Sequence, residues 1–229
     1  MKKSMKKSMK KSISRVFKEN TSLILFVSLM LVFRSAVADW NDVPTGSMKP
    51  TIVEGDRILV NKMAYDLRLP FSQHSLFKLA DPIANDIIIF ESKVADKRLV
   101  KRVIGVPGDT VSMHKNQLFI NQHPANYKLK SEHSGFAISQ ENIAGNNHLI
   151  RTQVKLGQEN SNKHASFKPL TIPDGYYLVM GDNRDNSADS RVIGLVPRDE
   201  IIGRSNTVVF SLNYDNYFLP RSSRFFKSI

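Results

Sequence analysis

The chain has 229 residues, of which 41% are hydrophobic and 24% charged, and it contains 11 Gly, 10 Pro and no Cys. This length and composition predict one globular unit with appendages, and they exclude a collagen-like, low-complexity or multi-span membrane protein. The lack of cysteine excludes disulfide scaffolds, thiolate metal sites and a Cys nucleophile. The net charge is +12, but +7 of it lies in residues 1–20. This distribution favours a membrane-topology signal over a nucleic-acid-binding surface.

The N-terminal segment predicts a membrane anchor. Residues 1–20 are a basic tail that begins with three Met-Lys-Lys-Ser repeats, and residues 21–33 then carry no charge. A helix that continued past Arg34 to Trp40 would supply a span of twenty residues, with the Arg34 head group reaching outward and Trp40 at the interface. We therefore expect a transmembrane helix over 21–40, the tail in the cytoplasm, and residues 41–229 beyond the membrane.

A cleaved secretory signal is the second interpretation of this segment. Residues 36–38 read Ala-Val-Ala, which is a small-x-small cleavage site before Asp39. The residues alone leave both interpretations open, and both place residues 41–229 on the far side of the membrane.

Beyond Trp40 the apolar residues occur in short runs rich in Val, Ile and Phe, bounded by Gly, Pro, Asn and Asp. This pattern predicts a mostly β domain over 41–229, with a hairpin turn at 114–116. Residues 122–170 are polar and lack periodicity, so we expect a less regular excursion there, and a peripheral tail over 221–229. The expected strands are residues 57–61, 86–90, 99–106, 110–113, 117–121, 176–180, 201–204 and 207–212.

The first candidate for chemistry is the loop of residues 43–51. Ser47 lies between Gly46 and Met48, with Pro44 and Pro50 on either side. A Gly at this place permits the backbone conformation that presents a nucleophile together with its own N–H. An ordinary turn is the alternative interpretation.

The second candidate is residues 98–109, where Lys101 and Arg102 stand side by side in an apolar strand. Strand alternation points the two side chains to opposite faces. A Lys held among apolar side chains loses hydration, which lowers its pKa and makes the neutral amine a general base. An edge-strand Lys in water is the alternative.

The third candidate is residues 181–191, which carry three Asp, two Arg, two Asn and two Ser. This density predicts a loop held by its own Asp–Arg pairs. The two arginines argue against a calcium loop. The six His are scattered without metal-ligand spacing, so we assign them no role.

Four segments together resemble the type I signal peptidases, which are membrane-anchored Ser-Lys endopeptidases that cut leader sequences from exported proteins. They are residues 44–51, 85–90, 101–109 and 181–191, in family order. The resemblance implies an antiparallel β catalytic core with a small cap and one retained N-terminal transmembrane helix. It also implies a single-pass protein of the plasma (inner) membrane, with the catalytic domain on the outer or periplasmic side. Many members have two membrane segments and a larger second β domain, and here the chain departs from the family.

The resemblance also assigns roles to residues. It implies that Ser47 is the nucleophile, that Lys101 is the general base, and that the hydroxyl of Thr45 and the backbone N–H of Ser47 hold the oxyanion. Ser187 matches the serine that orients the Lys amine. The supporting charged residues are Asp182, Arg184, Asp189 and Arg191. The expected substrate-pocket residues are Val43, Met48, Ile52, Leu99 and Val100.

The implied activity is removal of N-terminal signal peptides from exported preproteins through an acyl-enzyme, after small residues at the first and third positions before the cut. The expected partners are signal peptides and membrane lipid, without nucleic acid, metal or cofactor, and the expected state is a monomer. Two alternatives stay open. One is a specialised pilin-maturing peptidase of a conjugation system, and the other is an inactive membrane-anchored binding protein.

Overall fold

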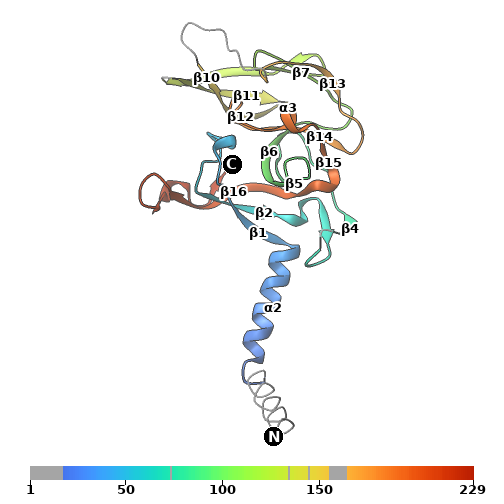
Figure 1. The fold of residues 1–229 in the computed structure, drawn as a ribbon, viewed down its shortest axis with the longest axis vertical. Helices are drawn as coiled ribbons and strands as arrows, with labels where there is room; N and C mark the ends of the chain where they lie inside the picture. Colours follow the sequence, from blue (N-terminus) through green and yellow to red (C-terminus); the bar gives the residue numbers. More distant parts are fainter. Residues whose placement is uncertain (1–17, 73, 134, 144, 155–163) are drawn as a thin grey trace.

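A long strand, β16, runs through the middle of the main sheet and joins its two halves (Figure 1). The structure is a computed structural model that describes residues 18–229 except 73, 134, 144 and 155–163. The sheet order is β1-β2-β16-β5-β6-β14-β15, with antiparallel neighbours, and β17 and β18 also pair with β16. Its strands are β1 (Ala38–Asp42), β2 (Asp56–Asn61), β5 (Ile87–Ser92), β6 (Lys97–Gly105), β14 (Tyr176–Met180), β15 (Val196–Pro197), β16 (Ile201–Asn213), β17 (Leu219–Pro220) and β18 (Lys227–Ser228).

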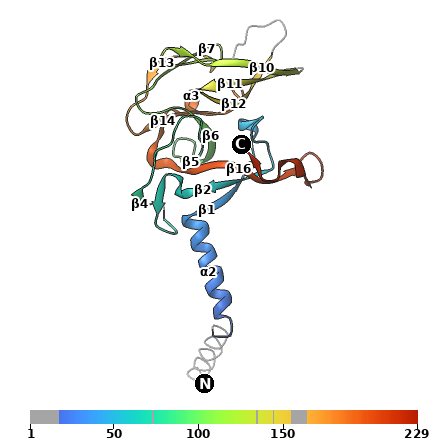
Figure 2. The same cartoon turned by 180° about the vertical axis from the view of Figure 1, so that it is seen from behind.

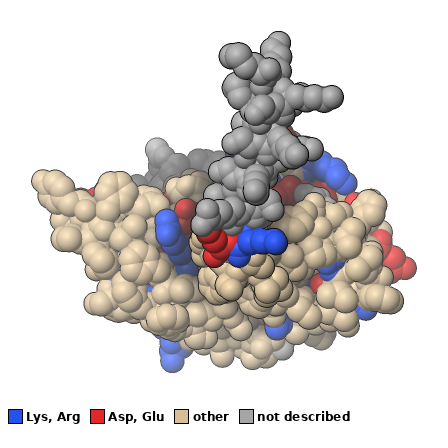
Figure 3. Space-filling model, turned by 90° about the horizontal axis from the view of Figure 1, so that it is seen from below, with Lys and Arg blue, Asp and Glu red and all other residues tan. Residues whose placement is uncertain are grey.

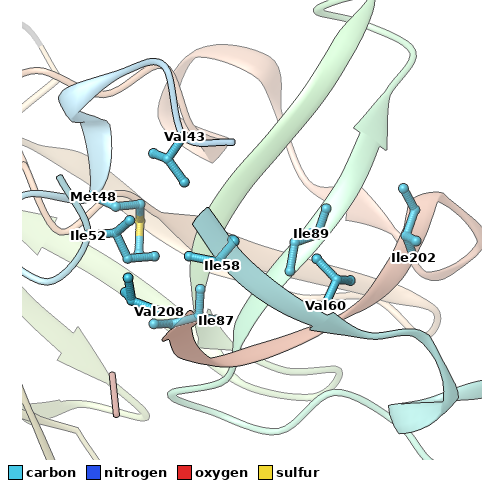
Figure 4. Close-up of a cluster of buried hydrophobic side chains, with 9 residues drawn as sticks. All are labelled: Val43, Met48, Ile52, Ile58, Val60, Ile87, Ile89, Ile202 and Val208. Carbon is cyan, nitrogen blue, oxygen red and sulfur yellow. The ribbon is translucent and has the colours of Figure 1, made fainter. Parts of the chain in front are cut away.

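Strand β5 of the main sheet is buried on both faces. In β5, Ile87 and Ile89 pack into one apolar cluster, while Ile88 and Phe90 pack into another. Successive side chains of a strand point to opposite faces, so both faces of β5 are covered and the strand carries no polar side. The first cluster joins β2, β5 and β16 to residues 43–52 (Figure 4).

Further sheets lie at the end of the domain away from the N-terminal helix, as both ribbon views show (Figures 1 and 2). One sheet has the order β13-β7-β8-β9 and another the order β10-β11-β12. Their strands are β7 (Thr110–His114), β8 (Gln117–Ile120), β9 (His123–Pro124), β10 (Asn126–His133), β11 (Phe136–Ile143), β12 (Asn146–Gln153) and β13 (Phe167–Thr171). A hairpin of β3 (Asp66–Arg68) and β4 (Ser75–Lys78) and a short helix α3 (Ser190–Ile193) complete the domain.

Each strand expected from the sequence overlaps an observed strand, and the two last ones are parts of the single strand β16. The hairpin turn is confirmed, because β7 and β8 are joined by Lys115 and Asn116, whose φ angles are 49° and 66°. Two consecutive residues of positive φ match the twist of a two-residue hairpin.

The expectation of a less regular excursion was wrong over residues 126–153, which form the regular sheet β10-β11-β12. The inward positions of β11 alternate, but one of them holds the fully buried Glu141, and His148 holds an inward position of β12. Because polar residues hold inward positions in these strands, the sequence lacks the alternation of apolar and polar residues that predicts a strand. Residues 155–163 of the excursion lie outside the described residues.

The expectation of a peripheral C-terminal tail was also wrong. Arg224 donates from Nε and Nη2 to the carboxylate of Asp56, at 2.9 and 2.5 Å, and from Nη2 to the carbonyl of Thr51 at 2.9 Å. Asp56 is fully buried. The tail thus supplies the counter-charge of a buried carboxylate and holds the segment that follows Ser47.

The N-terminal helix α2 (Thr21–Ala36) ends earlier than the expected 21–40. Residues 38–42 form β1 instead, because they pair with β2 and because Arg34 binds the Asp39 carboxylate at 2.7 Å. Trp40 therefore lies in a strand, with the Arg34 guanidinium over its ring. No helix in the described part of the chain is long and apolar enough to cross a membrane. Residues 1–17 of the expected basic tail lie outside the described residues.

Replacing Arg224 by Gln is expected to lower the free energy of unfolding by about 3 kcal/mol, because the buried Asp56 carboxylate would lose its charged partner. Urea unfolding of both proteins measures this. The exposed Lys93 offers the control, since Lys93→Gln is expected to change stability by less than about 0.5 kcal/mol. An Arg224→Gln variant as stable as the wild type would contradict the assigned role of the tail.

Candidate active site

The turn that carries Ser47 is fixed by its apolar neighbours. Val43, Met48 and Ile52 are at most 3% exposed and pack into the cluster of Figure 4. Backbone hydrogen bonds from Lys49 N to the Gly46 carbonyl and from Ile52 N to the Met48 carbonyl tighten the turn. Ser47 itself is half-buried and lines a cleft. Burial of the flanking residues therefore holds the hydroxyl at the edge of the core.

Lys101 projects from β6 to the same point. Its Nζ lies 2.8 Å from Ser47 Oγ and donates to the Val100 carbonyl at 2.9 Å. The side chain is buried, and this burial lowers the pKa of Lys101 from its ordinary 10.5 to about 8, against the opposing effect of Asp189 and Asp182. A lysine of this kind becomes a neutral amine at mildly alkaline pH.

Asn183, which the sequence reasoning did not single out, holds the backbone of the Ser47 turn. Its backbone N–H donates to the Ser47 carbonyl at 3.0 Å, and its Nδ2 donates to the Gly46 carbonyl at 2.9 Å. Gly181 completes the contact, because a Cβ there would lie 2.5 Å from the Ser47 carbonyl oxygen. The only signal in the sequence was the position of both residues inside the polar loop 181–191.

Two carboxylates close to Lys101 are each bound by an arginine. Asp182 accepts hydrogen bonds from Arg102 Nε and Nη2 at 2.9 and 2.8 Å, and Asp189 accepts from Arg191 Nε and Nη2 at 2.8 and 2.7 Å. Burial works to raise the pKa of both carboxyls, but the arginines hold each pKa below its usual value. Both groups are therefore ionised and structurally engaged.

Arg184 binds outside its own loop, contrary to the expectation that the loop pairs with itself. Its guanidinium binds both carboxylate oxygens of Glu141 on β11, and the hydroxyl of Tyr127 donates to Glu141 at 2.6 Å. Glu141 was also missed, since nothing in its sequence surroundings marks it. Burial opposes ionisation of Glu141, but Arg184 holds its pKa far below the usual range.

Strand β12 buttresses the same loop through its backbone. Arg151 N donates to the Asp182 carbonyl at 2.8 Å, and Arg184 N donates to the Arg151 carbonyl at 2.9 Å. The Gln153 N–H also binds the Asp185 carboxylate at 2.8 Å. The sheet β10-β11-β12 is thus a support for the polar loop and, through Asn183, for the Ser47 turn.

Ser187 and Thr45 lie near Ser47 and Asp189, and they make fewer hydrogen bonds than the charged residues of the loop. Ser187 Oγ is buried beside the Asp189 carboxylate but makes no hydrogen bond of acceptable geometry within the described residues. The bond to the Lys101 amine implied by the resemblance is therefore not formed in this structure. Thr45 is exposed and lines the cleft next to Ser47.

The cleft has a volume of about 830 Å³ and contains both Ser47 and Lys101. Of the expected pocket residues, Val43, Met48, Leu99 and Val100 line it. Ile52 does not, because it is fully buried in the core beneath the turn, and its assignment to a substrate pocket was wrong.

One wall of the cleft is an unpaired strand edge. Strand β14 pairs with β6 only from Arg102 to Gly105, whereas residues 97–101 of β6 pair with β5 alone among the described strands. All five of these residues line the cleft. Their free backbone edge offers hydrogen bonds to an extended chain.

Replacing Lys101 by Met is expected to raise the free energy of unfolding at pH 7 by about 2 kcal/mol, because it removes a charge that burial disfavours. The folded pKa lies below the unfolded one, so the unfolded chain binds more protons between pH 8 and 10.5 and wild-type stability rises over that range. The advantage of the variant should therefore shrink as the pH approaches 10.5. Thermal unfolding at pH 7 and pH 10, with Lys93→Met as the exposed control, measures both effects. A variant less stable than wild type at pH 7 would contradict this account of the burial of Lys101.

A family model and curated relatives of this chain all belong to one family. A family model described as signal peptidase, peptidase S26, matches residues 15–210. The chain is 36% identical to a signal peptidase I of Pseudomonas aeruginosa, over 82% of this chain and 69% of that protein. It is 30% identical to a signal peptidase I of Aquifex aeolicus, over 85% of this chain and 84% of that protein. A crystal structure of a signal peptidase I from Enterococcus faecalis is 29% identical and covers 56% of this chain and 98% of its own, with a TM-score of 0.36.

Proposed function

The chain belongs to the signal peptidase I family of serine endopeptidases, and from this premise we propose that it removes signal peptides from exported preproteins with a Ser47–Lys101 dyad. The observation that carries the proposal is the 2.8 Å separation of Lys101 Nζ and Ser47 Oγ inside a cleft, with the lysine buried. A nucleophile and its base within hydrogen-bond reach are the geometric requirement of this chemistry.

Acyl transfer proceeds in two halves. The neutral Lys101 amine takes the Ser47 proton as Oγ attacks the carbonyl carbon of the scissile bond, and it then returns the proton to the leaving amine. The Ser47 backbone N–H and the Thr45 hydroxyl donate to the oxyanion that forms on the carbonyl oxygen. In the second half, Lys101 takes a proton from water as that water attacks the acyl carbonyl carbon, and it returns the proton to Ser47 Oγ as the ester bond breaks and the signal peptide leaves.

Arg102 and Arg191 support this chemistry indirectly. Each neutralises a carboxylate that would otherwise pair with the Lys101 ammonium and raise its pKa. Ser187 lies beside Gly181 and the Asp189 carboxylate, and in this proposal it remains the residue that positions the Lys101 amine when substrate is bound. Asp182, Arg184 and Asp189 act by fixing the loop.

The substrate binds as an added strand. The open edge of residues 97–101 supplies main-chain hydrogen bonds, and an extended peptide places alternate side chains against Val43, Met48, Leu99 and Val100. Two of these side chains, Val43 and Met48, are almost fully buried, so they leave little depth for a large group. Small residues at the first and third positions before the cut fit this wall.

Helix α2 holds the enzyme at the membrane. Its apolar side chains are exposed, including Leu23 at 60%, Phe26 at 65% and Leu29 at 60%. Exposed apolar surface of this extent needs an apolar environment. Helix α2 within the described residues is not long and apolar enough to cross a membrane by itself. The placement of the basic tail in the cytoplasm and of the catalytic domain on the outer or periplasmic side therefore rests, in this proposal, on the positive-inside rule.

The dyad is tested by cleavage of a preprotein with an Ala-x-Ala site in detergent. Ser47→Ala and Lys101→Met are each expected to reduce kcat/KM by about 10⁴-fold, since each removes one half of the dyad. Lys93→Met, on the exposed surface, should cleave like the wild type, and the same preprotein with Leu at both small positions should resist cleavage. Full activity in Lys101→Met would show that another group is the base.

The pH profile tests the base separately. Because the neutral amine is the active form and the pKa of Lys101 is about 8, kcat/KM is expected to rise about tenfold per pH unit below pH 8 and to level off above it. Initial rates from pH 6 to pH 9.5 measure this. A flat profile over that range would contradict the assignment of the base.

A further inference from the structure

The cleft that holds the dyad extends to a second set of charged residues. Within the described part of the chain, its charged lining outside the dyad is Asp42, Glu91, Lys97 and Arg98. Each of the two acids is bound by an arginine, Asp42 by Arg57 at 2.6 Å and Glu91 by Arg98 at 2.6 Å. Lys97 is exposed and forms no hydrogen bond or ion pair with any described residue. This end of the cleft therefore carries one unpaired positive charge.

Lys97 differs in this respect from other charged residues of the domain. Around the N-terminal helix, basic and acidic side chains lie next to one another (Figure 3), and Asp39 binds both Arg34 and Lys62, at 2.7 and 3.5 Å. Asp96 precedes Lys97 in the chain but lies in the turn between β5 and β6, outside the cleft lining. The Lys97 ammonium, with its three N–H donors, is therefore free to bind a group that enters the cleft.

Strand β6 sets the position of Lys97 relative to the dyad. Lys97 precedes Lys101 by four residues, so their Cα atoms lie about 13 Å apart at roughly 3.3 Å per residue. Alternation along the strand places Lys97, Leu99 and Lys101 on the same face. Burial is the main cause of the lowered pKa of Lys101, and the charge of Lys97 lowers it further. The charge of Lys97 thus reaches the site of cleavage.

A bound peptide can pair with β6 in one direction only. Strand β14 occupies the edge from Arg102 onward, so a chain that lies at the dyad continues along β6 toward Lys97. The proposed function places the residue before the cut at Lys101 and the earlier residues against Leu99. Because neighbouring extended strands advance by the same length per residue, the third residue before the cut lies beside Leu99 and the fifth beside Lys97.

We propose that Lys97 forms a subsite for the fifth residue before the cut and selects an acidic side chain, Asp or Glu, at that position. The Lys97 ammonium donates a charge-assisted hydrogen bond to this carboxylate. Arg98 does not compete for it, because its guanidinium binds Glu91 and donates to Asn41 Oδ1 at 3.3 Å. The inference rests on the proposed cleavage of signal peptides and adds a position that the small-residue requirement leaves open.

Two peptides that differ only in Asp or Asn at the fifth position before an Ala-x-Ala site test the proposal. The wild type is expected to cleave the Asp peptide with a kcat/KM about threefold higher, as for an exposed ion pair, and high salt should reduce this preference. In Lys97→Gln the two rates should be equal, and Lys97→Glu should prefer Lys to Asp at that position. Lys93→Gln is the matched control, since Lys93 is exposed in the turn before Lys97 but lies outside the cleft lining, and it should keep the wild-type preference. Because each preference is a ratio within one enzyme, an effect of the substitution on Lys101 cancels.

Binding of the same peptides, fluorescently labelled, to Ser47→Ala protein separates this inference from the dyad, because binding does not depend on cleavage. Tighter binding of the Asp peptide, without cleavage of either peptide by the wild type, would overturn only the proposed function. Equal rates and affinities for the Asp and Asn peptides, or a wild-type preference in Lys97→Gln, would overturn the inference. A larger effect of Asp at the fourth or sixth position would also overturn it, since those side chains face away from Lys97. Thermal unfolding confirms that each variant is folded.

Discussion

A buried lysine that no carboxylate neutralises is the constraint on which the site depends. Lys101 has two carboxylates in its neighbourhood, and direct pairing with either would hold it as an ammonium. Arg102 occupies Asp182, and Arg191 occupies Asp189, each through two hydrogen bonds. The amine is left with Ser47 Oγ and a main-chain carbonyl as its partners. Asp189 and Arg191 of the loop thus bind each other, Asp182 binds Arg102 of β6, and Arg184 binds Glu141 of β11, so Lys101 keeps its hydrogen bond to Ser47.

The need to keep these carboxylates paired with arginines explains why segments outside the main sheet, such as β11 and β12, support the site. Holding two Asp–Arg pairs and a third Arg in a buried loop requires support from several directions. Strand β12 supplies main-chain hydrogen bonds to the loop, and β11 supplies Glu141 for Arg184. On the opposite side, Arg224 fixes Thr51 and Asp56 after the Ser47 turn. Asn183 joins the two halves by binding the carbonyls of Gly46 and Ser47.

The cleft and the C-terminal end of α2 are connected through β6 and its neighbour β5. Residues 97–101 present a free edge to the cleft, while Arg98 on the same segment binds the Glu91 carboxylate of β5 at 2.6 Å. Strand β1 follows α2 directly and leads into the turn that carries Ser47. Ser47 therefore lies only eleven residues after the end of α2.

The sequence by itself determined the strands β2, β5, β6, β14 and β16 of the main sheet and the hairpin turn, and it singled out Ser47 and Lys101 as candidates, because these features depend on local properties. Apolar runs report burial, Gly and Asn report turns, and the Ser and Lys segments are recognisable in their order along the chain. Only the tertiary structure decided the rest. Asn183 and Glu141 owe their roles to partners distant in sequence, the strands β10 to β12 bury polar residues where periodicity expects apolar ones, and Ile52 lies beneath the cleft instead of in its wall. The end of α2 was decided by pairing of β1 with β2, which no property of residues 37–42 alone encodes.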